Sequence, residues 1–363
     1  MARRVVVENT VLLIVRDPID EPEARAILTE AGYQVLKSIV VRRVDPSCYL
    51  GRGKLREVKS VVDALGVSKL CVFDELRPRQ VTCLMRELGV EVLDKVMVIL
   101  EIFSRHAGSK EAKLQIELAR LRHQLPLIRD WLRRAKLREL PGFLGAGEYA
   151  IDAYYRHVKS RIARIARELE ELRARRALER AKRRESGMPH IAIAGYTNSG
   201  KTTLFNLLTN LRKPTGTELF TTMSPKTYAV KMCGRKIAFV DTVGFIRKIP
   251  LEIVEAFRAV LEEISSADAI LLMLDASEDR ELVLEKFDSS IRLLREVGAH
   301  GIPTIVVLNK IDVANGVEEL VDAVTKVSSS YEMNVVDVVP ISALKRINVD
   351  RLKESICRVV ECL

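Results

Sequence analysis

Short apolar runs alternate with amphipathic stretches over the first hundred residues of the chain. The apolar runs, which predict buried strands, are Val11–Val15, Val35–Val41 and Leu70–Phe73. The amphipathic stretches, which predict helices, are Glu21–Ala31, Lys54–Leu65 and Arg79–Leu88. Because strands that alternate with helices are typical of a parallel sheet, we expect a small parallel α/β subdomain over residues 1–104.

A different pattern follows, in which apolar side chains recur every three or four residues. It extends from Leu114 to Leu132 and again from Ile151 to Leu172, and it predicts two long helices. The segment Pro141–Gly147 cannot continue either helix because it is rich in glycine and proline. We therefore expect a long antiparallel helical hairpin, resembling a coiled coil, over residues 105–185.

Alternation of strands and helices resumes after a break at Ser186–Pro189 and continues to Leu363. Three buried strands are expected at Ile191–Ala194, around Phe239 and at Ile305–Leu308. The sequence thus predicts a second α/β domain with a mostly parallel sheet over residues 186–363.

The positive charge of the protein is concentrated in the hairpin. The whole chain has 59 Lys and Arg against 49 Asp and Glu, while residues 105–185 alone have 22 against 11. One interpretation is a solvated coiled coil whose charges only keep it in solution. An excess concentrated in this way is more typical of a surface that meets the phosphates of a nucleic acid.

Composition excludes several other classes. With 48% hydrophobic and 30% charged residues the chain is globular, and its apolar runs are too short to span a membrane. The six cysteines form no CxxC pair and have no histidines at metal spacing, so neither a zinc site nor a disulfide framework is expected. This composition suits a protein of the reducing cytoplasm.

The segment Gly195–Thr202 has the GxxxxGK[ST] spacing of a phosphate-binding loop. It directly follows a predicted strand and opens a helix, which is the context the motif requires. Backbone N–H groups of such a loop surround the phosphates, Lys201 reaches the β- and γ-phosphates, and the Thr202 hydroxyl binds Mg²⁺.

Three further segments each follow an apolar strand. Asp241–Gly244 reads DxxG, in which the carboxylate holds Mg²⁺ through water and the Gly244 N–H meets the γ-phosphate. Asn309–Asp312 reads NKxD, and the Asp312 carboxylate accepts two hydrogen bonds that guanine can donate and adenine cannot. Ser342–Leu344 would place backbone N–H groups near the guanine O6. Together the four segments predict GTP binding.

At this point the chain resembles the translation-factor-related GTPases and, within them, the HflX family. Specific matches in the second α/β domain are Gly195–Thr202, Leu219–Pro225, Asp241–Pro250 and Asn309–Asp312. Outside it, the matches are Tyr49–Lys54, Leu100–Ala107, Lys113–Leu118 and Gly145–Glu148. Ser224 departs from the family's usual acidic residue, and Ala150–Asp152 replaces a more polar stretch. The additional C-terminal domain of many bacterial members is not expected here.

The resemblance implies a GTPase that binds the large ribosomal subunit through its rRNA and acts in ribosome splitting, rescue or biogenesis. It implies catalytic roles for Lys201, Thr222 and Gly244, and Mg²⁺ held by Thr202, Asp241 and the switch threonine Thr222. The expected nucleotide-binding residues are Gly195, Tyr196, Thr197, Asn198, Ser199, Gly200, Lys201, Thr202, Thr203, Phe220, Thr221, Thr222, Met223, Ser224, Asp241, Thr242, Val243, Gly244, Asn309, Lys310, Ile311, Asp312, Ser342, Ala343 and Leu344. We expect a monomer without a membrane span.

Phe245 occupies the position after DxxG where many GTPases carry a glutamine that orients the attacking water. A phenyl ring cannot do this, so slow hydrolysis is expected until another group assists. One alternative is a GTP-regulated RNA-binding or scaffold factor with little hydrolysis, and another is a GTPase that modifies tRNA. Gly51–Lys54 lacks the phosphate-loop spacing, so a tight turn before a helix is favoured there over a second nucleotide site.

Overall fold

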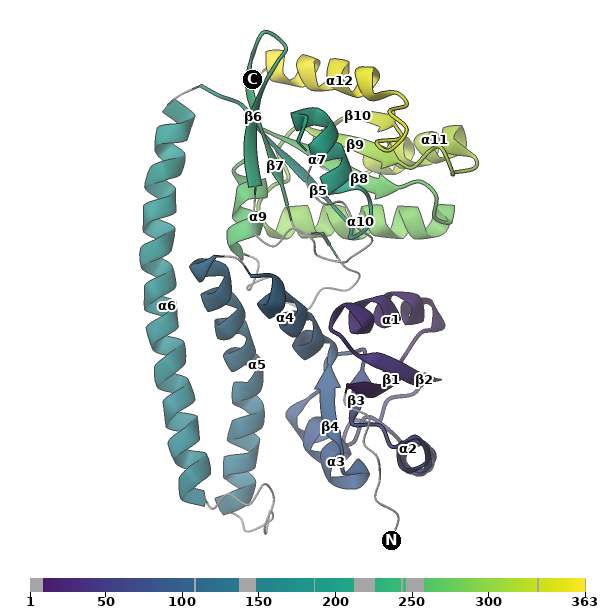
Figure 1. Cartoon of the computed structure of the whole chain (residues 1–363), viewed down its shortest axis with the longest axis vertical. Coiled ribbons are helices and arrows are strands. Elements are labelled where there is room, and N and C mark those ends of the chain that lie inside the picture. Colours follow the sequence, from purple (N-terminus) through teal and green to yellow (C-terminus); the bar gives the residue numbers. More distant parts are fainter. Residues whose placement is uncertain are drawn as a thin grey trace. The chain divides into compact units, whose positions relative to one another are not determined.

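The computed structural model describes residues 9–107, 109–136, 148–185, 187–211, 226–242, 244–245, 258–331 and 333–362. Contacts divide the chain into two compact units. Among the described residues, 9–105 and 113–171 belong to the first unit and the others to the second. Figure 1 labels the elements of both units, and each unit is described by itself.

The first unit begins with a small parallel α/β fold. Its four strands lie in the order β2-β1-β3-β4, all parallel. The strands are β1 (Thr10–Val15), β2 (Gln34–Val40), β3 (Lys69–Val72) and β4 (Glu91–Asp94). The helices are the short η1 (Pro18–Asp20), α1 (Glu21–Glu30), α2 (Arg52–Leu65), α3 (Pro78–Leu88) and α4 (Lys95–His106). The three strands and three helices predicted here are confirmed, with ends that differ by one or two residues.

The centre of this sheet is the fully buried strand β1. Its alternate residues Leu12 and Ile14 pack with Val58 and Val62 of α2, as the two-residue period of a strand requires. Helix α4 was not predicted from the sequence because its own apolar residues lie on almost all of its faces. Its buried residues include Val96, Val98, Ile99, Leu100, Ile102 and Phe103, which leave no regular polar stripe.

Two long helices, α5 (Lys110–Lys136) and α6 (Glu148–Glu185), form the predicted helical region. Within the first unit they lie side by side, as Figure 1 shows. Both apolar stripes are buried, at Leu114, Leu118, Ile128 and Leu132 of α5 and at Val158, Ile165 and Leu169 of α6. The Arg161 guanidinium of α6 donates two hydrogen bonds, of 2.6 and 2.7 Å, to the Glu117 carboxylate of α5.

Helix α5 is also anchored to the small sheet. The ring of His123 lies 2.7 Å from the Asp94 carboxylate at the end of β4, and the Trp131 indole donates a 3.1 Å hydrogen bond to the Thr82 hydroxyl of α3. The first unit therefore combines the small α/β fold with much of the helical region.

The second unit contains a six-stranded sheet in the order β10-β9-β8-β5-β7-β6. Its strands are β5 (His190–Gly195), β6 (Lys226–Met232), β7 (Arg235–Asp241), β8 (Ala269–Asp275), β9 (Thr304–Asn309) and β10 (Val335–Pro340). Its helices are α7 (Lys201–Thr209), α9 (Arg258–Ser265), α10 (Arg280–Glu296), α11 (Val317–Ser328) and α12 (Val349–Glu361). Only the pairing of β6 with β7 is antiparallel among these strands, which confirms the predicted mostly parallel sheet.

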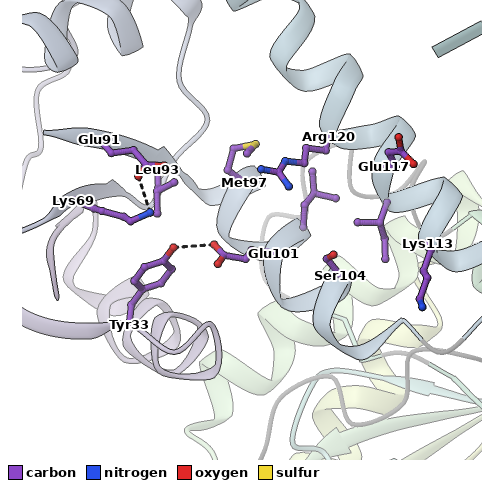
Figure 2. A pocket seen from close by; sticks show the side chains of 12 residues that line it. Tyr33, Lys69, Glu91, Leu93, Met97, Glu101, Ser104, Lys113, Glu117 and Arg120 are labelled. Carbon is purple, nitrogen blue, oxygen red and sulfur yellow. Dashed lines mark hydrogen bonds and ion pairs between the residues drawn. The ribbon is translucent and has the colours of Figure 1, made fainter. Parts of the chain in front are cut away.

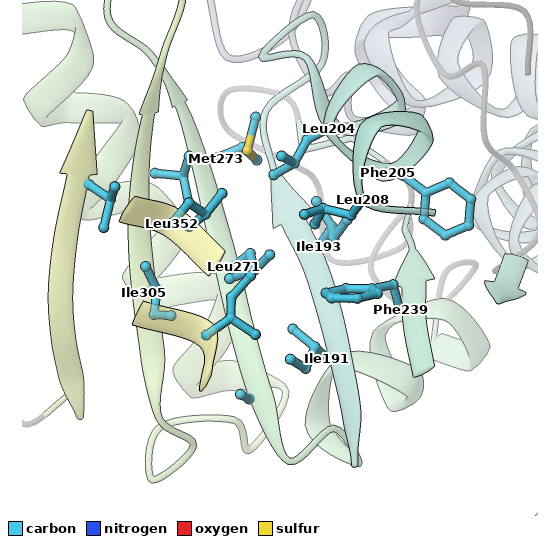
Figure 3. Close-up of a cluster of buried hydrophobic side chains, with 14 of the residues drawn as sticks. Ile191, Ile193, Leu204, Phe205, Leu208, Phe239, Leu271, Met273, Ile305 and Leu352 are labelled. Carbon is cyan, nitrogen blue, oxygen red and sulfur yellow. The ribbon is translucent and has the colours of Figure 1, made fainter. Parts of the chain in front are cut away.

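A hydrophobic core holds α7 and α12 against this sheet. Figure 3 shows Leu204 and Phe205 of α7 and Leu352 of α12 gathered over side chains of the central strands, including Ile193 and Leu271. The residues named are fully buried. This packing fixes the carboxyl ends of the strands, where the predicted nucleotide motifs lie.

The expectation that the cysteines form no disulfides was wrong. Cys48 is bonded to Cys83 in the first unit and Cys233 to Cys357 in the second, across 35 and 124 residues of sequence. Cysteine spacing gave no signal because both pairs are brought together by tertiary packing. The second bond joins the turn between β6 and β7 to α12.

Among the described helices, none is long and apolar enough to cross a membrane.

Candidate functional site

The loop between β5 and α7 requires glycine at both of its ends. Gly195 has a φ of 139°, and a Cβ there would lie 2.2 Å from the Met273 carbonyl oxygen of β8. Gly200 has a φ of 94°, and its Cβ would lie 2.2 Å from the side-chain nitrogen of Asn309. Both positions therefore need glycine for conformation and for space.

Lys201 is the first residue of α7, and its side chain is folded back over the loop. The Nζ atom donates a 2.6 Å hydrogen bond to the Tyr196 carbonyl. Burial lowers the pKa of Lys201 to about 8, although the nearby Asp241 carboxylate acts in the opposite direction. A bound anion would raise this pKa and stabilise the ammonium form, so the loop is suited to phosphate.

A hydroxyl and a carboxylate meet beside this lysine. The Thr202 hydroxyl at the start of α7 lies 3.4 Å from an Asp241 carboxylate oxygen at the end of β7. The next residue, Thr242, is buried and donates a 2.6 Å hydrogen bond to the Ile193 carbonyl of β5. Pairing of β5 with β7 thus places Thr202 and Asp241 together, as the sequence predicts.

The segment after Asp241 lies against the phosphate loop. The Phe245 N–H donates a 2.9 Å hydrogen bond to the Gly195 carbonyl, and the Thr197 N–H donates a 2.8 Å hydrogen bond to the Phe245 carbonyl. A Cβ on Gly244 would lie 2.8 Å from the Thr197 Cα and 2.9 Å from the Lys201 Nζ. The close approach of this segment to Thr197 and Lys201 therefore requires glycine at position 244.

The ring of Phe245 is buried, with 4% of its surface exposed, and packs edge-on against Tyr196 with 6.3 Å between ring centroids. This agrees with the packing role that a phenyl ring can take at this position. The pairing of the Phe245 backbone with the loop was not expected from the sequence.

Asn309 connects three of the predicted segments. Its side-chain NH₂ donates a 2.8 Å hydrogen bond to the Ser199 carbonyl, and its side-chain oxygen accepts a 2.9 Å hydrogen bond from the Ala343 N–H. Asn309 is itself buried at the end of β9. This amide thus joins the phosphate loop to the Ser342–Leu344 segment.

Lys310 adopts a φ of 68°, and its Nζ lies 2.5 Å from the Asp275 carboxylate at the end of β8. Asp275 is fixed in turn by hydrogen bonds from the N–H and hydroxyl of Ser277, at 3.1 and 2.6 Å. Asp275 was not among the site residues expected from the sequence. The available signal was a carboxylate directly after an apolar run, without a motif such as the DxxG that identified Asp241.

The remaining predicted residues divide into two groups. Ser342 is buried in the turn after β10, whereas Asp312 and Leu344 are exposed near the carboxyl ends of β9 and β10. The residues Phe220, Thr221, Thr222, Met223, Ser224 and Val243 lie outside the part of the chain that the structure describes.

The glycine-rich segment Gly51–Lys54 begins a helix. Gly51 precedes α2 in an extended conformation, and a Cβ on Gly51 or Gly53 would meet no atom within 4 Å. Lys54 pairs with Glu57 one turn later, at 3.0 Å. This geometry agrees with a turn before a helix.

The phosphate loop, Asp241, Asn309 and the Ser342–Leu344 turn all lie at carboxyl ends of parallel strands, where α/β sheets bind ligands. This fold and these motifs define a P-loop GTPase. A family model described as "50S ribosome-binding GTPase" matches residues 190–310. Models described as "GTP-binding GTPase N-terminal" and "GTP-binding GTPase Middle Region" match residues 20–104 and 106–183. The chain belongs to the HflX family of GTPases.

Similar proteins support this assignment along almost the whole chain. The GTPase HflX of Hyperthermus butylicus is 47% identical, over 94% of this chain and 92% of the relative. The GTPase HflX of Escherichia coli is 34% identical, over 85% of this chain and 72% of the relative. A crystal structure of a GTP-binding protein from the hyperthermophilic archaeon Sulfolobus solfataricus in complex with GDP is 38% identical. It has a TM-score of 0.54 and covers 97% of this chain and 99% of that one.

Proposed function

We propose that this protein binds GTP with Mg²⁺, hydrolyses it slowly, and acts on the large ribosomal subunit in the cytoplasm, in ribosome splitting, rescue or biogenesis. The observation that carries the nucleotide part is the convergence of four motif segments around Lys201 and Asn309. The ribosomal part is supported by the family and by the charge of the helical region.

Each residue has a role that follows from its position in this proposal. Lys201 and the N–H groups of Gly195–Thr202 bind the phosphates, and the Gly244 N–H meets the γ-phosphate. Asp312 reads the guanine, the Lys310 stem covers the purine face, and the Ser342–Leu344 turn faces O6. Asp275 joins these residues as one that positions Lys310, since its carboxylate accepts a hydrogen bond from the Lys310 ammonium group.

The residues present fit a magnesium ion. Mg²⁺ prefers hydroxyl and carboxylate oxygens together with phosphate, and Thr202 and Asp241 bring such oxygens within 3.4 Å of each other. In the proposal these two side chains and Thr222 hold the ion, which neutralises charge on the phosphates.

Slow hydrolysis follows from the position of Phe245. Its ring packs on Tyr196 and carries no group that could orient water. Binding of the phosphates by Lys201 and the loop would remain, so the reaction would wait for a group supplied by the partner.

The ribosomal contact in this proposal is the basic hairpin, with the protein acting as a monomer. Exposed arginines and lysines on α5 and α6 include Arg122, Arg129, Arg133, Arg156, Lys159, Arg164, Arg167 and Arg175. Burial of the apolar stripes leaves these side chains in solvent, where they can pair with rRNA phosphates. Arg133 and Arg134 also pair with Asp130, at 3.2 and 2.7 Å.

Co-sedimentation tests this contact directly. Changing Arg129, Arg133, Arg134 and Arg138 to Glu should abolish pelleting with purified large subunits and leave GTP affinity unchanged, because phosphate contacts dominate such interfaces. Of these four residues, Arg138 lies outside the part of the chain that the structure describes. A matched variant reverses four exposed charges of the second unit, Arg235, Lys236, Lys326 and Arg351. Equal loss of binding in both variants, or pelleting of the hairpin variant at moderate salt, contradicts the proposed surface.

The alternative function, a GTP-regulated scaffold with little hydrolysis, retains the same surface. GTP turnover in the presence of large subunits separates the two, because stimulation by the subunit belongs to the enzyme alone.

A further inference from the structure

A cavity of about 480 Å³ is lined by residues of the first unit, none of which belongs to the proposed GTP site. Its walls come from the amino ends of β3 and β4, from α4 and from α5. Figure 2 shows Lys69, Glu91 and Tyr33 at one end, Glu101 and Ser104 of α4 along one side, and Arg120 of α5 opposite. Its volume lies in the range of small-molecule pockets.

At the sheet end of the cavity, the charged groups neutralise one another. The Lys69 ammonium lies 2.7 Å from the Glu91 carboxylate. Burial acts to lower the pKa of Lys69, but its contacts with Glu91 and Tyr33 outweigh this and raise the pKa. Tyr33, in turn, donates a 2.9 Å hydrogen bond to Glu101.

The two other carboxylates that line the cavity are also engaged. Glu101 pairs with Arg105 at 3.2 Å in addition to its bond from Tyr33. Glu117 accepts both hydrogen bonds of the Arg161 fork. All three acidic side chains of the cavity therefore have cationic partners outside or within it.

Three donors remain. Arg120, Lys113 and Ser104 make no hydrogen bond or ion pair with any group that the structure describes. Arg120 and Lys113 are exposed and seven residues apart, so they lie on one face of α5, about 10 Å apart along the helix axis. Figure 2 shows the Arg120 guanidinium directed toward Met97 and the Lys113 ammonium directed away from it, so both long side chains would have to change rotamer to contact one ligand. The unpaired charged groups of the cavity are thus both cationic, and they carry two positive charges.

We propose that this cavity binds a small organic phosphomonoester. Arg120 and Lys113 bind the phosphate, with the planar fork of Arg120 matching two of its oxygens. Ser104 adds a third donor. The apolar side chains of Leu93, Met97, Leu100 and Ile116 then line the space for the organic part.

A monoester fits this arrangement better than a phosphodiester of RNA. The second pKa of a phosphate monoester is near 6, so at neutral pH it carries close to two negative charges, against one for a diester. Two unneutralised cations therefore match the monoester. The phosphate oxygens of a monoester and of a diester can accept hydrogen bonds from the same donors, so the test must distinguish the two ligands.

Full-length protein saturated with GDP and Mg²⁺ is titrated with phenyl phosphate by calorimetry, so that the GTP site is already filled. Phenyl phosphate should bind with a stoichiometry of one, more tightly than inorganic phosphate, methyl phenyl phosphate or a short single-stranded RNA. Arg120→Gln should weaken this binding about tenfold or more, since it removes a charge-assisted pair. Ser104→Trp, which fills the cavity without removing a charge, should also weaken it.

Arg56→Gln is the matched control, because Arg56 is exposed on α2 in the same unit and does not line the cavity. Three results overturn the proposal: no binding of phenyl phosphate at millimolar concentration, binding that Arg120→Gln leaves unchanged, or equal or tighter binding of the diester or the RNA. None of these results bears on the proposed GTPase activity, whose site lies in the other unit.

Discussion

Asp312 is the residue on which guanine selectivity should depend. In the proposed site its carboxylate would pair with the N1–H and the amino group of guanine, and adenine would leave it without these partners. We expect Asp312→Asn to weaken GTP binding by about 3 kcal/mol, or roughly 100-fold, because two charge-assisted hydrogen bonds are lost. The variant should gain affinity for xanthine nucleotides, whose extra carbonyl accepts from the new amide.

Competition binding of GTP, ATP and XTP measures this exchange. Asp322→Asn is the matched control, since Asp322 is exposed on α11, away from the NKxD segment. Unchanged GTP affinity in Asp312→Asn would refute the assignment of this residue.

Single residues were predictable from the sequence where chemistry requires one residue type at one spacing. Gly195 and Gly200 are in this class because a Cβ would clash at either position. Lys201 is in it because its ammonium group reaches back over the loop to the Tyr196 carbonyl. Asp275 was not predictable in the same way, since its contact with Lys310 depends on β8 and β9 being neighbours in the sheet.

At the scale of elements, periodicity predicted those that bury one face. The stripes of α5 and α6 belong to this group, whereas the fully buried strand β1 was predicted from its continuous apolar run. Periodicity could not predict α4, which is buried on almost all sides, or the strand β4, in which only two apolar residues stand between two acidic ones.

The disulfides give a prediction at this scale. In the chain-entropy account a crosslink stabilises more as its loop lengthens, which gives about 4 kcal/mol for Cys48–Cys83 and about 5 kcal/mol for Cys233–Cys357. Reduction should therefore lower the melting temperature of the protein, by about 10 °C or more. Scanning calorimetry with and without dithiothreitol measures the shift.

Cys233→Ala and Cys357→Ala should each reproduce the loss from the second bond. Cys362→Ala is the control, because Cys362 is exposed and makes no disulfide in the described structure. A thiol titration that finds six free thiols in the unreduced protein, or a melting temperature that reductant leaves unchanged, would show that the bonds do not form.

At the scale of the whole molecule, the positive charge and the nucleotide chemistry belong to different parts of the chain. The basic excess lies in residues 105–185, whereas the phosphate loop, Asp241 and Asn309 lie beyond residue 190. In the proposed function, the basic part of the chain binds rRNA and the partner supplies the group that the nucleotide site lacks for hydrolysis.

Hydrolysis should accordingly be slow in the isolated protein and much faster on the large subunit. Supplying a missing transition-state group to a GTPase raises its rate by about 10³- to 10⁵-fold, so even a partial effect is measurable. Single-turnover hydrolysis of GTP, with and without purified large subunits, tests this in the wild type and in Phe245→Gln. Because Phe245 is buried against Tyr196, a glutamine there would not reach the attacking water, and the variant should stay slow without subunits. Fast turnover by the isolated wild type that subunits do not change would instead identify a self-sufficient GTPase.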